Sequence, residues 1–347
     1  MVLGYLLARC GVRTLVLESQ QDFDRDFRGD TLHVGVLEIF DSLGLAERLL
    51  TLPHFKIRKA TVGNLDLIDF SVLKTPFPFL TMMAQSAFLD WLSEEAKSYA
   101  CFQLIMGANV RELLRDDAGT IRGVRYRKDH DLTEVRSELV IACDGRASHV
   151  RKEAELEPVP MTDPMEVLWF RLPRREEDGE QFKTGPLVNG RLPFILLERP
   201  EHYQIAAIIH PGHYTAIRKE GLPAFHERLR EAAPGLYERA VETLDDWKDI
   251  AFLHVEGSRL PTWHMPGLLL IGDAAHVMTP VGGVGINYAI WDAVEAANVL
   301  VPVWHNDQTV TEKHLAEIQR RRERPTKIMQ ALQRLAGRRV LNAVAAD

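Results

Sequence analysis

The most constraining feature of this sequence is a continuous stretch near its end in which strand, loop and helix signals follow one another. Four aliphatic residues at 268–271 predict a short buried strand, and Gly272 and Asp273 follow it, so the strand ends in a carboxylate. Pro280 and three further glycines predict a loop whose backbone conformations side chains would hinder. The apolar period of residues 287–300 predicts a helix, and free N–H groups and the positive dipole at its N-terminus favour negative charge.

A glycine-rich turn between a strand and a helix often binds no ligand, and this alternative applies to any such loop taken alone. The complete string is less common, because it combines a strand-end Gly-Asp, a histidine three residues later, a proline and the pattern Gly-Gly-x-Gly-x-Asn. It resembles the second flavin motif of the FAD-dependent aromatic hydroxylases, the p-hydroxybenzoate hydroxylase-like monooxygenases. In that family the Asp binds the ribityl chain, and the loop and helix N-terminus face the isoalloxazine ring. The resemblance implies that Pro280 and Gly285 form the flavin-ring environment. It implies these cofactor-binding residues: Gly272, Asp273, Pro280, Gly283, Gly285, Ile286 and Asn287.

Composition and charge exclude several other classes of protein. A length of 347 residues is enough for a sizeable core and two lobes. The net charge of -7 gives no reason to expect nucleic-acid binding, and no apolar run approaches the length of a membrane span. Cys10, Cys101 and Cys143 are widely spaced, which suits a reducing cytoplasm and makes neither a disulfide framework nor a metal site. We therefore expect a cytoplasmic globular protein without a bound metal.

The start of the chain predicts a helix, a turn at Gly11 and a short buried strand at 14–18 that closes on Glu18. This is the order found in the second half of a dinucleotide-binding βαβ unit, where the terminal acid accepts hydrogen bonds from an adenosine ribose. A surface acid at a strand end is the alternative for Glu18. The first half of the unit, a strand and a G-x-G-x-x-G loop, does not precede this helix. We hypothesise that the sequence starts at an internal methionine of a longer protein.

Three further positions are assigned by the resemblance. Arg28 corresponds to the family arginine that reaches the FAD ribose and pyrophosphate, and a guanidinium suits phosphate oxygens. Gln85 opens a predicted helix at 86–98, where the family places a glutamine that binds the flavin nucleotide. Val110 lies in the first of two strands joined by a turn at 116–119, and corresponds to a residue whose backbone touches the adenine. A solvated loop arginine and a polar residue at a helix start are the alternatives for Arg28 and Gln85.

A second fingerprint follows a predicted buried strand at 138–143. Asp144 and Gly145 end that strand, Ser148 comes three residues after the glycine, and the string closes at Arg151. Gly145 allows close approach of another group, and Ser148 can cap the next turn. The string resembles the family motif that serves FAD and NAD(P)H together, which implies that Asp144 and Gly145 bind the cofactor. A surface turn is the alternative for the Asp-Gly dipeptide alone.

The pattern of residues 161–259 predicts an antiparallel sheet, because strand-like runs are separated there by turns that contain proline, glycine and charged residues. In the resemblance this is the substrate domain, to which we also assign the proline-rich residues 53–84. Four aromatic residues are candidates to line its pocket, with core packing as the alternative. They are Trp169, Phe170, Phe194 and Tyr203.

The last part of the chain predicts a charged helix at 311–324, which Pro325 is expected to interrupt before a second helical run at 326–340. Its arginine cluster has acidic neighbours and indicates a solvated face rather than a binding patch. Among residues of the glycine-rich stretch, His276 is expected to be structural rather than catalytic.

Taken together, the sequence predicts an α/β fold with two domains. Residues 1–52, 85–160 and 260–347 are expected to form a Rossmann-like FAD-binding domain of the glutathione reductase type, without its first strand and glycine loop. Residues 53–84 and 161–259 are expected to form a second, antiparallel-sheet substrate domain.

The resemblance also implies a reaction. NADH or NADPH reduces FAD, O2 adds to the flavin, and the resulting C4a-hydroperoxide hydroxylates an aromatic or polyketide-like small molecule. A flavin reductase or dehydrogenase on the same scaffold, which inserts no oxygen, is one alternative. A truncated protein that cannot hold FAD is the other. The substrate, the choice between NADH and NADPH and the oligomeric state are left open.

Overall fold

The computed structural model describes residues 1–24, 31–62, 65–162, 164–178, 182, 184–187, 192–199 and 201–345. Among these residues, parallel strands occur in two pairs. Strand β1 (Thr14–Glu18) pairs along its whole length with β7 (Phe102–Met106). Strand β11 (Val140–Ala142) pairs with β20 (Leu268–Leu270), whose other edge carries the short antiparallel strand β19 (His264–Met265). The buried aliphatic runs that predict these strands therefore form parallel pairs, as a Rossmann-like sheet requires.

Three helices pack together against these strands. They are α1 (Val2–Arg9), α4 (Gln85–Lys97) and α9 (Gly285–His305), and their apolar faces form one continuous core. Gly4 sets how closely α1 approaches β1, because a Cβ at Gly4 would lie 2.7 Å from Val16 Cγ2. The parallel strands and the helices on them confirm the predicted α/β class.

An antiparallel meander extends this region. It consists of β8 (Asn109–Arg115), β9 (Ile121–Lys128) and β10 (Asp131–Arg136), and helix α5 (His149–Glu153) contacts β8. Asp116 shapes the predicted turn, because its Oδ1 accepts from the backbone N–H groups two and four residues later, at 3.1 and 2.9 Å. The predicted hairpin is confirmed.

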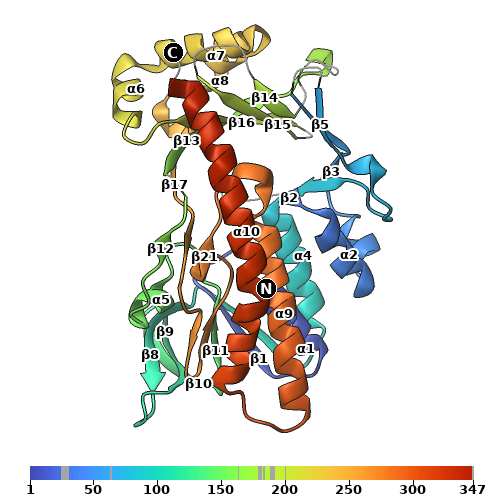
Figure 1. Ribbon diagram of the computed structural model, residues 1–347, viewed down its shortest axis with the longest axis vertical. Helices are drawn as coiled ribbons and strands as arrows, with labels where there is room; N and C mark the ends of the chain where they lie inside the picture. Colours follow the sequence, from blue (N-terminus) through green and yellow to red (C-terminus); the bar gives the residue numbers. More distant parts are fainter. Residues whose placement is uncertain are drawn as a thin grey trace.

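A five-stranded antiparallel sheet occupies the upper end of the molecule (Figure 1). One face of this sheet is covered by α6 (Tyr214–Glu220), α7 (Leu222–Ala232) and α8 (Tyr237–Thr243). It confirms the predicted second, antiparallel-sheet part of the fold. The strand order is β14 (Gly185–Leu187), β15 (Phe194–Glu198), β16 (His202–Ile209), β13 (Met165–Pro173) and β17 (Ala251–Val255).

The two faces of this sheet differ in what they contact. Phe170, Phe194 and Tyr203 are fully buried in the core between the sheet and its helices. Trp169 points to the opposite face, because side chains alternate along a strand, and packs there against a buried cluster that Val281 of the glycine-rich loop also contacts. Three of the four aromatic residues considered for the pocket are therefore core residues, and Trp169 alone of the four lies on the face towards that loop.

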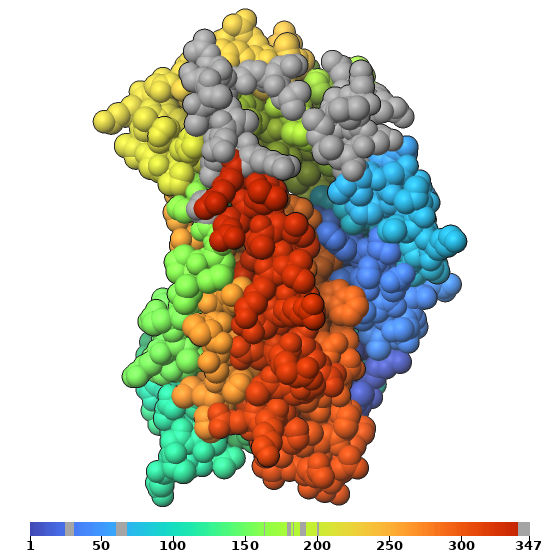
Figure 2. Space-filling model, viewed as in Figure 1, coloured from blue at the N-terminus to red at the C-terminus, as the bar shows by residue number. Residues whose placement is uncertain are grey.

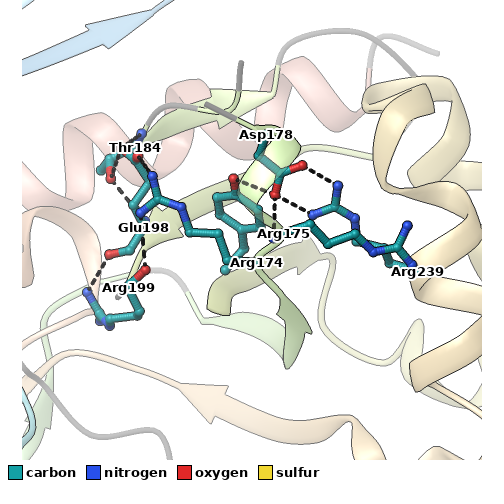
Figure 3. Close-up of polar contacts among 8 residues, drawn as sticks. Arg174, Arg175, Asp178, Thr184, Glu198, Arg199 and Arg239 are labelled. Atoms are coloured by element: carbon teal, nitrogen blue, oxygen red, sulfur yellow. Dashed lines mark hydrogen bonds and ion pairs between the residues drawn. The ribbon is translucent and has the colours of Figure 1, made fainter. Parts of the chain in front are cut away.

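A buried ion pair holds a helix to this sheet (Figure 3). Arg239 of α8 donates to both carboxylate oxygens of Asp178, with Nη1 2.6 Å from Oδ2. Tyr203 Oη and the backbone N–H of Arg175 also donate to Asp178 Oδ2, at 3.1 and 2.9 Å. The Arg239 hydrogen bonds hold the pKa of Asp178 far below its usual range. Burial and the hydrogen bond to Asp178 raise the pKa of Tyr203 to about 12.

The remaining elements are short strands and helices. Part of the segment assigned to the substrate domain packs in the first core, because Phe77, Phe79 and Met83 belong to the same cluster as α4 and α9. The division of the chain into domains stays a prediction. The elements are β2 (Thr31–Leu32), α2 (Val34–Ser42), α3 (Ala46–Leu49), β3 (His54–Ile57), β4 (Lys59–Val62), β5 (Leu65–Asp69), β6 (Leu80–Met83), β12 (Val159–Pro160), β18 (Ser258–Arg259) and β21 (His276–Val277).

The last helix, α10 (Glu312–Ala345), is continuous, so the predicted interruption at Pro325 is wrong. A proline inside a helix removes one hydrogen bond and costs about 3 kcal/mol. Hydrogen bonds beside the proline help to hold the helix: Thr326 Oγ1 donates to Arg322 O at 2.8 Å, and Tyr288 Oη of α9 donates to Pro325 O at 3.4 Å. The helix follows the long axis of the molecule and forms much of one face (Figures 1 and 2). In the described part of the chain, no helix is long and apolar enough to cross a bilayer.

Candidate functional site

The two carboxylates predicted at strand ends come from neighbouring strands. Strands β11 and β20 run parallel, with Ala142 paired to Leu270, so the chain leaves both strands at the same edge of the sheet. Asp144 stands two residues beyond the first pairing partner and Asp273 three residues beyond the second. Ligands of open parallel sheets bind at this carboxyl edge.

Arg151 joins the two loops that follow these strands. Its guanidinium is buried and donates from Nη1 to Ala274 O at 2.9 Å and from Nη2 to Arg146 O at 2.7 Å. One side chain therefore fixes the Asp144 loop against the Asp273 loop. The sequence contains this arginine in the second fingerprint, but its partner in the other motif shows only in the structure.

The Asp144 carboxylate organises its own turn. It accepts from Ser148 Oγ at 2.5 Å and from the backbone N–H of Val150 at 3.0 Å. Ser148 in turn accepts from Arg151 N at 2.9 Å, which confirms the predicted cap of α5. Gly145 has φ +82°, and nothing lies within 4 Å of where its Cβ would be, so another group has room to approach. Binding of a cofactor by Asp144 and Gly145 stays a prediction.

Gly272 fixes the end of β20 against helix α9. Its backbone has φ +59°, and a Cβ there would lie 3.1 Å from the Cβ of Ala289. Its N–H donates to Asp292 Oδ2 of α9 at 2.9 Å. The glycine is thus required both by the backbone conformation and by the close approach of the helix.

Replacing Gly272 with alanine is expected to destabilise the protein by about 2–3 kcal/mol, because the left-handed conformation costs about 1–2 kcal/mol for alanine and the helix must also shift. Gly119→Ala is the matched control, since Gly119 has φ +81° but open space around its Cβ position. Urea unfolding of both variants measures the difference. Equal losses of stability would show that the contact with Ala289 contributes nothing.

A buried polar cluster lies beneath the Gly272–Asp273 turn. Asp292 is fully buried and accepts from His276 Nε2 at 2.6 Å and from Arg322 Nε at 2.7 Å, besides Gly272 N. Burial by itself would raise the pKa of Asp292. The charges and hydrogen bonds of His276 and Arg322 lower the pKa by more than burial raises it, so the pKa lies below its usual range. His276 thus makes a structural contact, in line with the expectation for it. Asp292 was not predicted as a site residue, because its local signal is only an acid within an alanine-rich helix.

The glycine-rich loop ends at an uncapped helix. Gly282 and Gly283 have φ +81° and +59°, which only glycine adopts readily. Helix α9 begins at Gly285, and no side chain caps its first turn, so the N–H groups there are available to a ligand. Pro280 is exposed and Ile286 is half-buried on this same segment. An electronegative ring edge placed here would meet the positive end of the helix dipole.

Asn287 holds the main chain around this loop. Its Oδ1 accepts from His33 N at 2.7 Å, and its Nδ2 donates to Thr31 O at 2.8 Å and to Gly283 O at 3.0 Å. Burial lowers the pKa of His33, whose Nε2 lies 3.1 Å from Gly282 O, so a neutral ring protonated on Nε2 donates there. The amide of Asn287 therefore shapes the loop, and its predicted contact with the cofactor stays a prediction.

Residues predicted for the adenosine side lie around the end of β1. Glu18 O accepts from the N–H of Ala108 at 2.8 Å, two residues before Val110, so Glu18 and Val110 lie near one another. Glu18 Oε1 accepts from Gln20 N at 2.9 Å. Gln85 opens α4, and among the described residues its buried Oε1 has no hydrogen-bond partner. Arg28 lies outside the described residues.

These features fit a flavin nucleotide. An uncapped helix N-terminus suits the electronegative ring, open space at Gly145 admits a close neighbour, and the buried Gln85 oxygen needs a donor that a ligand can supply. A cavity of about 490 Å3 lies elsewhere, beside the end of β16 and helices α6 and α7, and none of the predicted site residues lines it. A common cavity for Asp144, Asp273 and Gly285 therefore stays a prediction.

Known proteins match nearly the whole chain. The family model described as FAD binding domain matches residues 1–331. The 6-methylpretetramide 4-monooxygenase of Streptomyces rimosus is 31% identical over 358 residues, which cover 99% of this chain and 84% of that relative. Pentachlorophenol 4-monooxygenase of Sphingobium chlorophenolicum is 24% identical; the match covers 90% of this chain but only 60% of that relative. The crystal structure of p-nitrophenol 4-monooxygenase from Pseudomonas putida DLL-E4 has the same fold, with a TM-score of 0.77 at 18% identity, covering 99% of this chain and 89% of that one.

Proposed function

This chain belongs to the FAD-binding-domain family, as an FAD-dependent monooxygenase of the p-hydroxybenzoate hydroxylase-like kind, and from this membership we propose that it hydroxylates an aromatic or polyketide-like small molecule. The observation that carries the proposal is the 31% identity to a polyketide monooxygenase over 99% of the chain. The parallel pairing of β11 and β20 supports it, because the loops that follow these two strands leave the same edge of the sheet and are joined by Arg151.

The proposed reaction balances with NADH or NADPH and O2. A ring C–H bond becomes C–OH and one oxygen atom of O2 enters the product. The other oxygen atom leaves as water, with two electrons and one hydrogen from the hydride of NAD(P)H and one added proton, and NAD(P)+ is released. FAD supplies the electron transfer from the nicotinamide to O2.

The protein's own residues would bind and orient these groups. Asp273 would accept hydrogen bonds from the ribityl chain, and Gln85 and Glu18 would bind the nucleotide. The N–H groups at Gly285 and Ile286 would stabilise negative charge on the ring, as donors fixed in advance do most effectively. The apolar sheet face with Trp169 and Val281 would exclude water from the substrate side.

We also propose that the protein acts in the cytoplasm. Its three cysteines are free, as in proteins of a reducing compartment. No partner beyond the small-molecule substrate, O2 and the nicotinamide is part of the proposal.

The test is a turnover experiment with purified protein and FAD. We expect NAD(P)H oxidation, O2 uptake and hydroxylated product in equal amounts, with isotopically labelled dioxygen delivering one labelled atom to an aromatic polyketide. NAD(P)H oxidation that needs no O2 and yields a product without added oxygen would instead identify a flavin reductase. A protein that takes up no FAD would contradict the proposal altogether.

A further inference from the structure

One face of α10 carries buried polar side chains. Arg322, Thr326, Gln330 and Gln333 follow one another at intervals of four, four and three residues, which places them on one side of the helix. All four are buried, and both glutamines are only 2% exposed. Burying an amide is unfavourable unless its hydrogen bonds are made, so the partners of these side chains are informative.

Gln333 binds the main chain of the glycine-rich loop on both sides of Pro280. Its Nε2 donates to Thr279 O at 2.8 Å and to Val281 O at 2.7 Å, and its Oε1 accepts from Thr279 N at 3.1 Å. Both N–H bonds and one acceptor position of the amide are used. Every partner is a backbone atom, so the side chain fixes the path of the loop whatever the loop's side chains are.

Gln330 holds the strand that leads into the loop. Its Nε2 donates to Ser258 O at 2.9 Å and to Val277 O at 3.1 Å, which joins β18 to β21. Its Oε1 accepts from Arg259 Nη1 at 2.7 Å. About two turns earlier in the helix, Arg322 contacts Asp292 and through it the turn at Gly272.

The same helix contacts the antiparallel sheet beyond the loop. A Cβ at Gly337 would lie 3.2 Å from the Cε of Met165 in β13, so the helix passes close to the sheet one turn after Gln333. Met165 belongs to the sheet face that also packs with Val281. Helix α10 therefore contacts both the loop and the sheet that faces it.

We propose that α10 positions the flavin-facing loop, and that Gln333 is the positioning residue that sets where residues 279–281 stand against bound flavin and against the substrate sheet. This inference rests on the proposed function, because the loop faces a flavin only if the chain binds FAD. The glycines at 282 and 283 allow the loop many conformations, and the three hydrogen bonds that the buried Gln333 amide makes, two donated and one accepted, select one of them.

The test compares two glutamines of α10. Gln319 makes the same kind of contact away from the loop: its Oε1 accepts from Trp263 N at 2.9 Å and its Nε2 donates to Pro261 O at 2.9 Å. Gln333→Met and Gln319→Met remove each amide while keeping most of the side-chain volume. FAD dissociation constants, the visible absorption spectrum of the bound flavin, Tm, kcat and KM are measured for both variants and the wild type.

We expect both variants to lose a few degrees of Tm, because each loses hydrogen bonds worth about 1 kcal/mol apiece. Only Gln333→Met should bind FAD about tenfold more weakly, shift the flavin absorption bands and lower kcat with little change in KM. If Gln333→Met does not fold, Gln333→Asn takes its place, since it keeps the amide but withdraws it from the loop by one methylene; the same changes are expected.

The outcomes separate the inference from the proposed function. A wild-type protein that takes up no FAD overturns both. If the wild type binds FAD and the Gln333 variant keeps the wild-type dissociation constant and spectrum, only the role of Gln333 is overturned. Equal changes of affinity and spectrum in the Gln333 and Gln319 variants also overturn it, because they would reflect general destabilisation of α10.

Discussion

Replacing Asp273 with alanine is expected to weaken FAD binding by about 100-fold and to give a nearly colourless purified protein. A carboxylate that accepts hydrogen bonds from ligand hydroxyls contributes about 1.5–3 kcal/mol, and each 1.4 kcal/mol is a factor of ten in affinity. Asp273 stands at the end of β20 in a turn that Gly272 and Arg151 hold on both sides. Its backbone is therefore fixed before the cofactor arrives, and little of the interaction is lost to ordering the loop.

Two further variants make the Asp273 experiment specific. Asp273→Asn keeps the shape and one acceptor oxygen, so its affinity for FAD should fall between those of wild type and alanine. Asp117→Ala removes an exposed acid from the turn between β8 and β9 and should leave binding unchanged. Flavin absorbance after purification and a fluorescence titration with added FAD give the constants. An Asp273→Ala protein that keeps its full flavin content would contradict the assigned role.

Features with local signals could be predicted from the sequence. The strand before Gly272, the glycine loop and the helix after it are adjacent in the chain, and periodicity and glycine positions indicate each of them. The cap at Ser148 follows from its position after an Asp-Gly turn. The fold class followed from the resemblance, and parallel strands with a separate antiparallel sheet confirm it.

Features that depend on distant partners could not be predicted. Gln333 and Thr279 are 54 residues apart, and nothing near either residue indicates their contact. For the same reason Pro325 led to a wrong prediction: the packing that keeps α10 continuous comes partly from Tyr288 of another helix. Asn287 and Asp144 show a further limit of prediction from motifs. Each side chain makes hydrogen bonds that hold the loops around it, so its place in a motif does not by itself establish contact with the cofactor.

Replacing Asp292 with asparagine is expected to destabilise the folded protein by about 3–5 kcal/mol, because Arg322 is left as a buried charge without its carboxylate and one amide N–H must face a donor. Asp178→Asn is a closely matched control. Each carboxylate is buried, and each accepts from one arginine, one ring-bearing side chain and one backbone N–H. Both losses are large beside a total stability of roughly 5–15 kcal/mol, so urea unfolding resolves them.

The two variants should differ in flavin binding and agree in acid sensitivity. Only Asp292 holds the turn at Gly272, so only Asp292→Asn should weaken FAD binding in protein that remains folded. Both carboxyls have a folded-state pKa below the ordinary value, so their stabilisation is complete above about pH 5 and is lost as the pH falls through about 4 towards the folded-state pKa. Each asparagine variant should therefore lose less stability than wild type on acidification over that window. Equal FAD affinities in the two variants would show that the Asp292 cluster supports the fold without fixing the flavin turn.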